Sequence, residues 1–112
     1  MKGNKSVLIL VIWISFSAFR WDDAPRKVRE GNRLFEKKEY GEALDRYKKA
    51  EMKRPDAPEI PFNIGNSYYR QHAFEEAIAS HKRTLELDKG PLQSKAQYNI
   101  GNSLYRQGDL KE

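Results

Sequence analysis

Ten residues of this chain occur twice with little change. FNIGNSYYRQ spans residues 62–71 and YNIGNSLYRQ spans residues 98–107, so the copies lie 36 positions apart. Eight of the ten letters are identical, and the two differences exchange one large apolar side chain for another. A Gly-Asn pair also stands at Gly31 and Asn32, 34 positions before the same pair in the first copy. A period of this length is the signature of stacked repeats, each burying its apolar face against its neighbours.

The spacing of apolar residues from Trp21 onward indicates helices. They recur every three or four residues, and β-branched runs are few. Turn signals, including DKGP at residues 88–91, separate the periodic stretches. We predict helices over residues 25–38, 41–53, 59–71, 75–87 and 92–107, followed by the stub of a sixth. The chain is therefore expected to be all-α, with antiparallel helix-turn-helix repeats stacked as an α-solenoid of about two and a half repeats.

Glycines at equivalent places inside the predicted helices point to close helix contacts. A helical glycine costs about 1 kcal/mol relative to alanine, and close approach of a partner helix explains why it is kept. Small residues stand at fixed offsets in the following helix and are expected to face these glycines. The predicted packing positions are Gly31, Ala43, Ala50, Gly65, Ala77 and Gly101.

This pattern of small and bulky residues closely resembles the tetratricopeptide repeat, a helix-turn-helix unit of 34 residues. The residues of the first unit that carry the resemblance are Gly31, Leu34, Tyr40, Ala43, Tyr47, Ala50 and Pro55. The second unit departs from the pattern with Lys89 where proline is usual. The resemblance covers residues 24–112 and implies repeats at 24–57 and 58–91 and a truncated repeat at 94–112.

The start of the chain has the features of a targeting segment. Lys2 and Lys5 precede a run of 13 uncharged, mostly apolar residues at 7–19. A membrane-spanning helix needs about 20, so we predict a cleaved signal peptide at residues 1–18 and a linker at 19–23, with a retained short anchor as the alternative. The mature protein is then expected in the periplasm or cell envelope, possessing an anchor only if residues 7–19 remain.

The order of these segments resembles that of one group of tetratricopeptide proteins in particular. A signal peptide, a short WDD linker and a VREGNRLFEKKEYGEALDRYKKA unit look like the envelope tetratricopeptide proteins of bacterial aerotolerance (Bat) operons. That resemblance implies a place in an aerotolerance-type complex and von Willebrand A-domain proteins as partners.

The sequence contains no recognisable catalytic machinery. Cysteine is absent, which excludes thiol chemistry and disulfides. The two histidines, His72 and His81, have no second ligand at a zinc-like spacing, and the glycines do not form a phosphate-binding loop. We therefore predict a protein that is not an enzyme and has no metal or cofactor. His81 is expected to be a packing residue with its nitrogens hydrogen-bonded, and His72 a solvated turn residue.

The charge balance argues against nucleic acid as a partner. The formal net charge is +5, and loss of Lys2 and Lys5 with a signal peptide would leave 19 basic and 16 acidic residues. This mild excess favours acidic partners but falls short of a concentrated basic stripe. Nucleic acid is therefore not an expected ligand.

A partner is expected in the concave face, which the first helix of each unit lines. The candidate positions are Val28, Arg29, Asn32, Phe35, Glu36, Phe62, Asn63, Asn66, Tyr69, Arg70, Lys95, Tyr98, Asn99, Asn102, Tyr105 and Arg106. Asn32, Asn66 and Asn102 recur at equivalent places, either to bind a peptide main chain or to join helices. Arg70 and Arg106 are suited to carboxylates.

The family resemblance adds a more specific expectation. Some tetratricopeptide proteins hold a peptide's terminal carboxylate with five residues. Asn32, Asn63 and Lys95 match that set, whereas Val28 and Asn99 replace its other charged members. We expect a scaffold that binds an acidic or carboxylate-ended partner segment, with self-assembly by end-to-end repeat stacking as the alternative.

Overall fold

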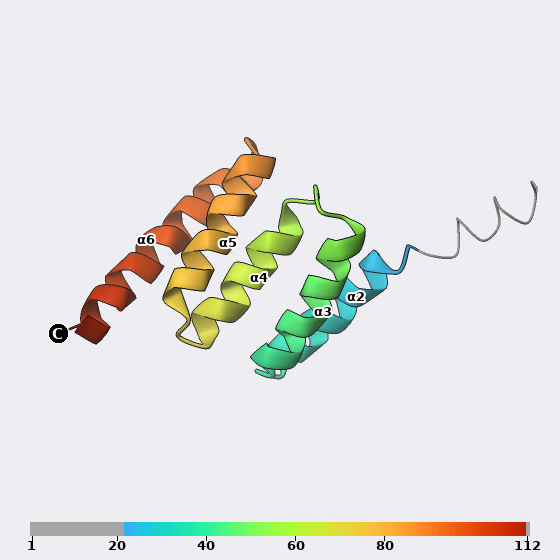
Figure 1. Cartoon of the computed structure of the whole chain (residues 1–112), viewed down its shortest axis with the longest axis horizontal. Helices are drawn as coiled ribbons and strands as arrows, with labels where there is room; N and C mark the ends of the chain where they lie inside the picture. Colours follow the sequence, from blue (N-terminus) through green and yellow to red (C-terminus); the bar gives the residue numbers. More distant parts are fainter. Residues whose placement is uncertain (1–21, 112) are drawn as a thin grey trace, which may run out of the picture.

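The computed structural model describes residues 22–111, which form five α-helices with no strand among them. The helices are α2 (Ala24–Glu36), α3 (Tyr40–Lys53), α4 (Glu59–Arg70), α5 (Phe74–Leu87) and α6 (Pro91–Lys111). Helices α2 and α3 pair through a short turn, α4 and α5 pair in the same way, and α6 packs against α5 (Figure 1). The predicted fold of stacked helix pairs is confirmed. The predicted signal peptide lies outside the described residues.

Four helices begin and end within two residues of their predicted bounds, but the end of the chain differs. We predicted a turn at Gln107-Gly108 and the stub of a further helix, and this is wrong. Helix α6 continues through Gly108 to Lys111. The equivalent turn in the second unit brings α5 back onto α4. No described helix follows α6, so a turn there gains no packing and the helix continues.

The turn within each hairpin uses a residue with a left-handed backbone. Lys38 has φ 63° and His72 has φ 62°, a conformation that strains side chains other than glycine. In the first turn, the amide of Glu39 donates to the carbonyl of Leu34 at 2.9 Å. The closure of the turn therefore holds Lys38 in an unfavourable conformation.

Replacing Lys38 by glycine is expected to stabilise the fold. Glycine adopts positive φ without steric cost, but it also makes the unfolded chain more flexible, so folding loses more conformational entropy. The relief of strain should be the larger effect, and we expect the free energy of unfolding to rise by about 0.5–1 kcal/mol. Urea unfolding followed by circular dichroism would measure the change. Lys37→Gly is the matched control, because Lys37 has φ −78° and glycine there brings only the entropic cost. Equal effects of the two substitutions would contradict this account.

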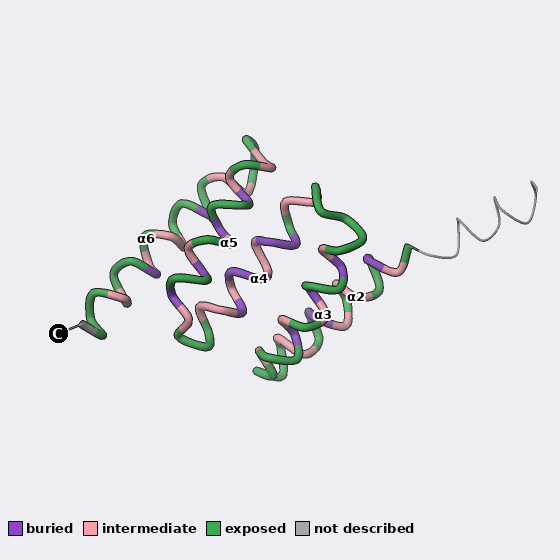
Figure 2. The backbone as a smooth tube through the Cα atoms, viewed as in Figure 1, coloured by how far each residue is buried: buried purple, intermediate pink, exposed green. Residues whose placement is uncertain are grey.

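The core lies between α2 and α3 and continues into the contact between α3 and α4 (Figure 2). Its fully or nearly fully buried residues are Ala24, Ala43, Tyr47, Ala50, Ile60 and Ile64. Partly buried apolar side chains, among them Val28, Leu34 and Tyr68, pack around this cluster. The first and second units therefore share one continuous core.

Two of the three predicted packing glycines do mark close helix contacts, but with partners we did not predict. A Cβ added to Gly31 would lie 2.6 Å from the Tyr47 ring, and one added to Gly65 would lie 2.7 Å from the His81 ring. The glycines thus make room for a ring. Ala43, Ala50 and Ala77 are fully buried but are not the nearest neighbours.

The third glycine does not match the prediction. A Cβ at Gly101 would meet no described atom within 4 Å, because no described helix covers that side of α6. Leu104 and Tyr105 on the same helix are 54% and 72% exposed.

Within residues 22–111, no helix has the length and hydropathy needed to cross a membrane.

Candidate functional site

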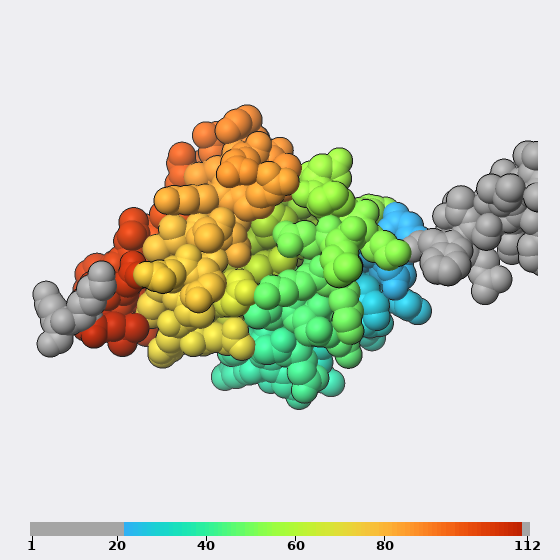
Figure 3. All heavy atoms as spheres, viewed as in Figure 1, coloured from blue at the N-terminus to red at the C-terminus, as the bar shows by residue number. Residues whose placement is uncertain are grey.

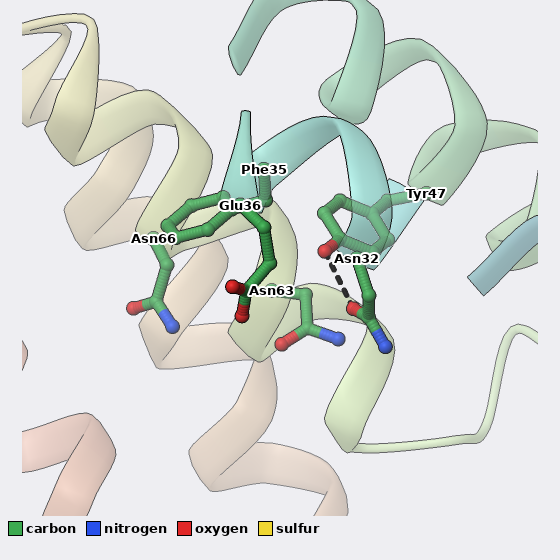
Figure 4. A pocket seen from close by; sticks show the side chains of 6 residues that line it. All are labelled: Asn32, Phe35, Glu36, Tyr47, Asn63 and Asn66. Atoms are coloured by element: carbon green, nitrogen blue, oxygen red, sulfur yellow. Dashed lines mark hydrogen bonds between the residues drawn. The ribbon is translucent and has the colours of Figure 1, made fainter. Parts of the chain in front are cut away.

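Three adjoining hollows run along the first helices of the units, α2, α4 and α6. The first, of about 210 Å³, is lined by Asn32, Phe35, Glu36, Tyr47, Asn63 and Asn66 (Figure 4). The second, of about 460 Å³, is lined by Phe35, Asn66, Tyr69, Arg70, Asn99, Asn102 and Arg106. The third, of about 310 Å³, is lined by Phe62, Ser94, Lys95, Tyr98 and Asn99. Shared residues join neighbouring hollows, so together they form one surface, called the groove below.

Most of the predicted concave-face residues line this groove. The exceptions are Val28, Arg29 and Tyr105, which line none of the three hollows. Sequence reasoning missed Tyr47, which belongs to α3 and reaches the groove through its hydroxyl. In the sequence, Tyr47 stands only among the residues of the repeat pattern, and no sequence signal shows that its hydroxyl bonds to Asn32, 15 residues earlier.

Two of the three recurring asparagines make hydrogen bonds within the chain. The Tyr47 hydroxyl donates to Asn32 Oδ1 at 2.7 Å (Figure 4). Burial raises the pKa of Tyr47 to about 12, so this donor stays protonated at neutral pH. Asn99 Nδ2 donates to Asn66 Oδ1 at 3.0 Å and ties α6 to α4. Each bond uses one of the two lone pairs of a carbonyl oxygen, and the Nδ2 groups of Asn32 and Asn66 are the donors that these side chains can offer to the groove.

The charge of the groove changes along its length. Glu36, Arg70 and Arg106 stand at equivalent positions in the three units, so the wall is acidic at α2 and basic at α4 and α6. The Arg106 guanidinium lies over the rings of Phe74 and Tyr69, 5.6 and 6.0 Å from their centroids. Such cation–π contacts position the group. Two guanidinium groups and several amides therefore converge on the second hollow.

The three residues that match the family's carboxylate-binding set do not line one common hollow. Asn32 and Asn63 line the first hollow, whereas Lys95 lines the third beside Tyr98. The second hollow, between them, brings Arg70 and Arg106 together instead. Within the groove, the two guanidinium groups therefore lie on the hollow between α4 and α6.

His81 is buried as predicted, but the expected hydrogen bonds are absent. Its side chain is fully buried, and neither ring nitrogen has a partner among the described residues. The ring meets Phe62 edge-on at 5.4 Å between centroids. Burial lowers the pKa of His81 to about 4, so the ring is neutral at pH 7. His72 is exposed in the turn, and the described residues include no group of three His, Cys, Asp or Glu that could hold a metal ion.

Comparisons with known proteins agree with the fold of stacked helix pairs. Residues 31–72 match a family model described as TPR repeat, and residues 62–112 match one described as tetratricopeptide repeat. The TPR domain of Sgt2 from Aspergillus fumigatus is a similar solved structure, with 27% sequence identity and a TM-score of 0.70. The alignment covers 80% of this chain and 58% of that one, so this chain spans less than two thirds of that domain. A search of curated proteins found no match.

Proposed function

We propose that this chain, which consists of tetratricopeptide repeats, is a protein-interaction module and that its groove binds an acidic or carboxylate-ended segment of a partner protein. The observation that carries the proposal is the pairing of Arg70 and Arg106 on the second hollow. Guanidinium groups bind carboxylates through two parallel hydrogen bonds. A hollow of about 460 Å³ has room for such a group with part of its main chain.

The rest of the groove fits an extended segment. Asn32 and Asn66 offer N–H donors from their Nδ2 groups, and their oxygens are bonded to Tyr47 and Asn99. Peptide carbonyls are the matching acceptors. Tyr69 and Tyr98 add apolar surface on α4 and α6. The segment is therefore held along its main chain and anchored by an acidic group between α4 and α6.

Reversing both guanidinium charges is expected to abolish capture of this partner. In the Arg70→Glu/Arg106→Glu variant, loss of two charge-assisted contacts, worth about 1.5–3 kcal/mol each, predicts at least a 100-fold drop in affinity. A pull-down from envelope extract, followed by titration with a synthetic peptide of the captured segment, would measure it. Lys53→Glu/Lys82→Glu is the control, because both lysines are exposed and line no part of the groove. Unchanged affinity in the groove variant would count against the proposal.

The cellular setting is a further part of the proposal. Residues 7–19 and the resemblance to aerotolerance proteins support an envelope location and von Willebrand A-domain partners. Fractionation of cells that produce the tagged chain would test the location. Recovery only in the cytoplasmic fraction would contradict it, while leaving the groove proposal intact.

The alternative, self-assembly by end-to-end stacking, draws on the exposed apolar face of α6. Leu104, Tyr105 and Leu110 are 54%, 72% and 68% exposed. Their equivalents in the first unit, Leu34, Phe35 and Tyr40, are only partly exposed because that unit has its second helix. Stacking predicts a mass that rises with concentration in analytical ultracentrifugation and stays monomeric in Leu104→Asn/Tyr105→Asn. A wild type that is monomeric at all concentrations would exclude it.

A further inference from the structure

The outer side of the first hairpin carries a basic hollow that is separate from the groove. It is lined by Lys27, Glu30, Arg33, Leu34, Lys37 and Arg46, from α2 and α3. We call this surface the end face, since α2 and α3 form one end of the array (Figure 3). The hollow has a volume of about 470 Å³.

The end face cannot hold another repeat of this kind. In the second unit, the positions equivalent to Lys27, Glu30 and Arg33 are Pro61, Ile64 and Ser67. All three are buried, and Ile64 belongs to the core cluster shared with the first hairpin. The charged residues of the first unit stand where repeat-to-repeat packing needs apolar or small ones, and burying them would cost several kcal/mol per charge. The end face is therefore built for a polar surrounding.

The end face also has more cations than its acidic residue can balance. Glu30 contacts Arg46 at 3.2 Å and Lys27 at 3.5 Å. Arg33 and Lys37 form no ion pair with any residue between 22 and 110. A terminal repeat needs only a polar outer face for solubility. The surplus positive charge fits an anionic partner.

The end face follows closely after the apolar N-terminal run in the sequence. The apolar run at residues 7–19 ends four residues before Asp23, the residue that precedes α2. Four residues span at most about 14 Å. With 13 residues, the run is shorter than the roughly 20 that cross a bilayer. A single weak apolar anchor holds a protein only marginally, and a basic patch is a common second contact.

We propose that, in the chain that retains residues 7–19, the end face binds the headgroups of an anionic phospholipid bilayer. Lys27 and Arg33 of α2 and Lys37, the residue after α2, line the same hollow, so they can meet phosphate groups together. This contact holds the array beside the membrane. The contact does not depend on the groove, because the groove is lined by different residues of α2, namely Asn32, Phe35 and Glu36.

Vesicle binding by the full chain tests the proposal. The Lys27→Gln/Arg33→Ser/Lys37→Gln variant introduces the residues of the second unit at two of the three sites. Each cation near an anionic surface changes partitioning about fivefold, so the variant should bind phosphatidylglycerol-containing vesicles roughly 100-fold more weakly. Its partitioning to pure phosphatidylcholine vesicles should match that of the wild type, because residues 7–19 are unchanged.

A control separates the end face from net charge. Lys53→Ser/Lys82→Ser/Lys89→Ser removes three exposed cations that do not line the hollow, and it should keep most of the binding to anionic vesicles. Equal losses in the two variants, or equal wild-type binding to anionic and neutral vesicles, would overturn the proposal. If the end-face variant keeps vesicle binding but loses an acidic protein from a pull-down, the end face belongs to a protein partner instead.

Discussion

Gly65→Leu is expected to open the second hairpin and lower the free energy of unfolding by about 3 kcal/mol or more. Even the first added carbon would lie 2.7 Å from His81 Cε1 and Nε2. The His81 ring is fully buried, so it cannot turn aside without displacing α5. Overpacking of a filled core costs about 1–3 kcal/mol, occasionally more, and leucine adds three further carbons. Urea unfolding followed by circular dichroism would measure the loss.

The chain supplies a matched control for this prediction. Gly101 stands in the same Asn-Ile-Gly-Asn-Ser pentapeptide, yet an added Cβ there meets no described atom within 4 Å. Gly101→Ala should therefore stabilise α6 by about 0.5–1 kcal/mol, the usual gain in helix propensity. Gly65→Ala should destabilise the fold. If both alanine variants shifted stability equally, the helix contact at Gly65 would be disproved.

This pair of glycines shows how far the sequence can predict the packing. The cost of a helical glycine and the repeat period were sufficient to predict a close contact at Gly65. The contacting atom was not predictable, because it depends on how α5 is rotated about its axis, and a ring at position 81 reaches the glycine before the alanine at position 77. The identical letters around Gly101 have a different neighbourhood because the contact depends on a neighbouring helix.

The groove was predictable to a similar extent. The repeat period was enough to predict that Arg70 and Arg106 share one wall, since equivalent positions of stacked units face the same way. The bond between Asn66 and Asn99 was not predictable, because it depends on the distance between α4 and α6. The sequence could therefore predict the face but not which amide groups remain available to a ligand.

The second large effect is a loss of stability in mild acid, caused by His81. The neutral ring is favoured in the folded state, where burial lowers its pKa to about 4, and the unfolded chain takes up a proton near pH 6.5. Between these values the unfolded state binds more protons, so stability falls as the pH decreases. At about 1.4 kcal/mol per pH unit, the loss from pH 7 to pH 5 should be about 2 kcal/mol. Urea unfolding at the two pH values would measure it.

His81→Tyr should remove most of this pH dependence. Tyr47 fills the same place against Gly31 in the first hairpin, so the slot can hold a tyrosine ring. Asp22 and Asp45 do not contribute to the change in stability between pH 7 and pH 5. Arg54 and Lys49 hold the pKa values of these carboxyl groups below 3.8, so the stability that the two pairs add is lost only at a pH lower than 5. His72→Asn, which alters the exposed turn histidine, should keep the wild-type slope between pH 7 and 5. A flat wild-type profile, or an unchanged slope in His81→Tyr, would show that His81 is not the residue that sets the acid sensitivity.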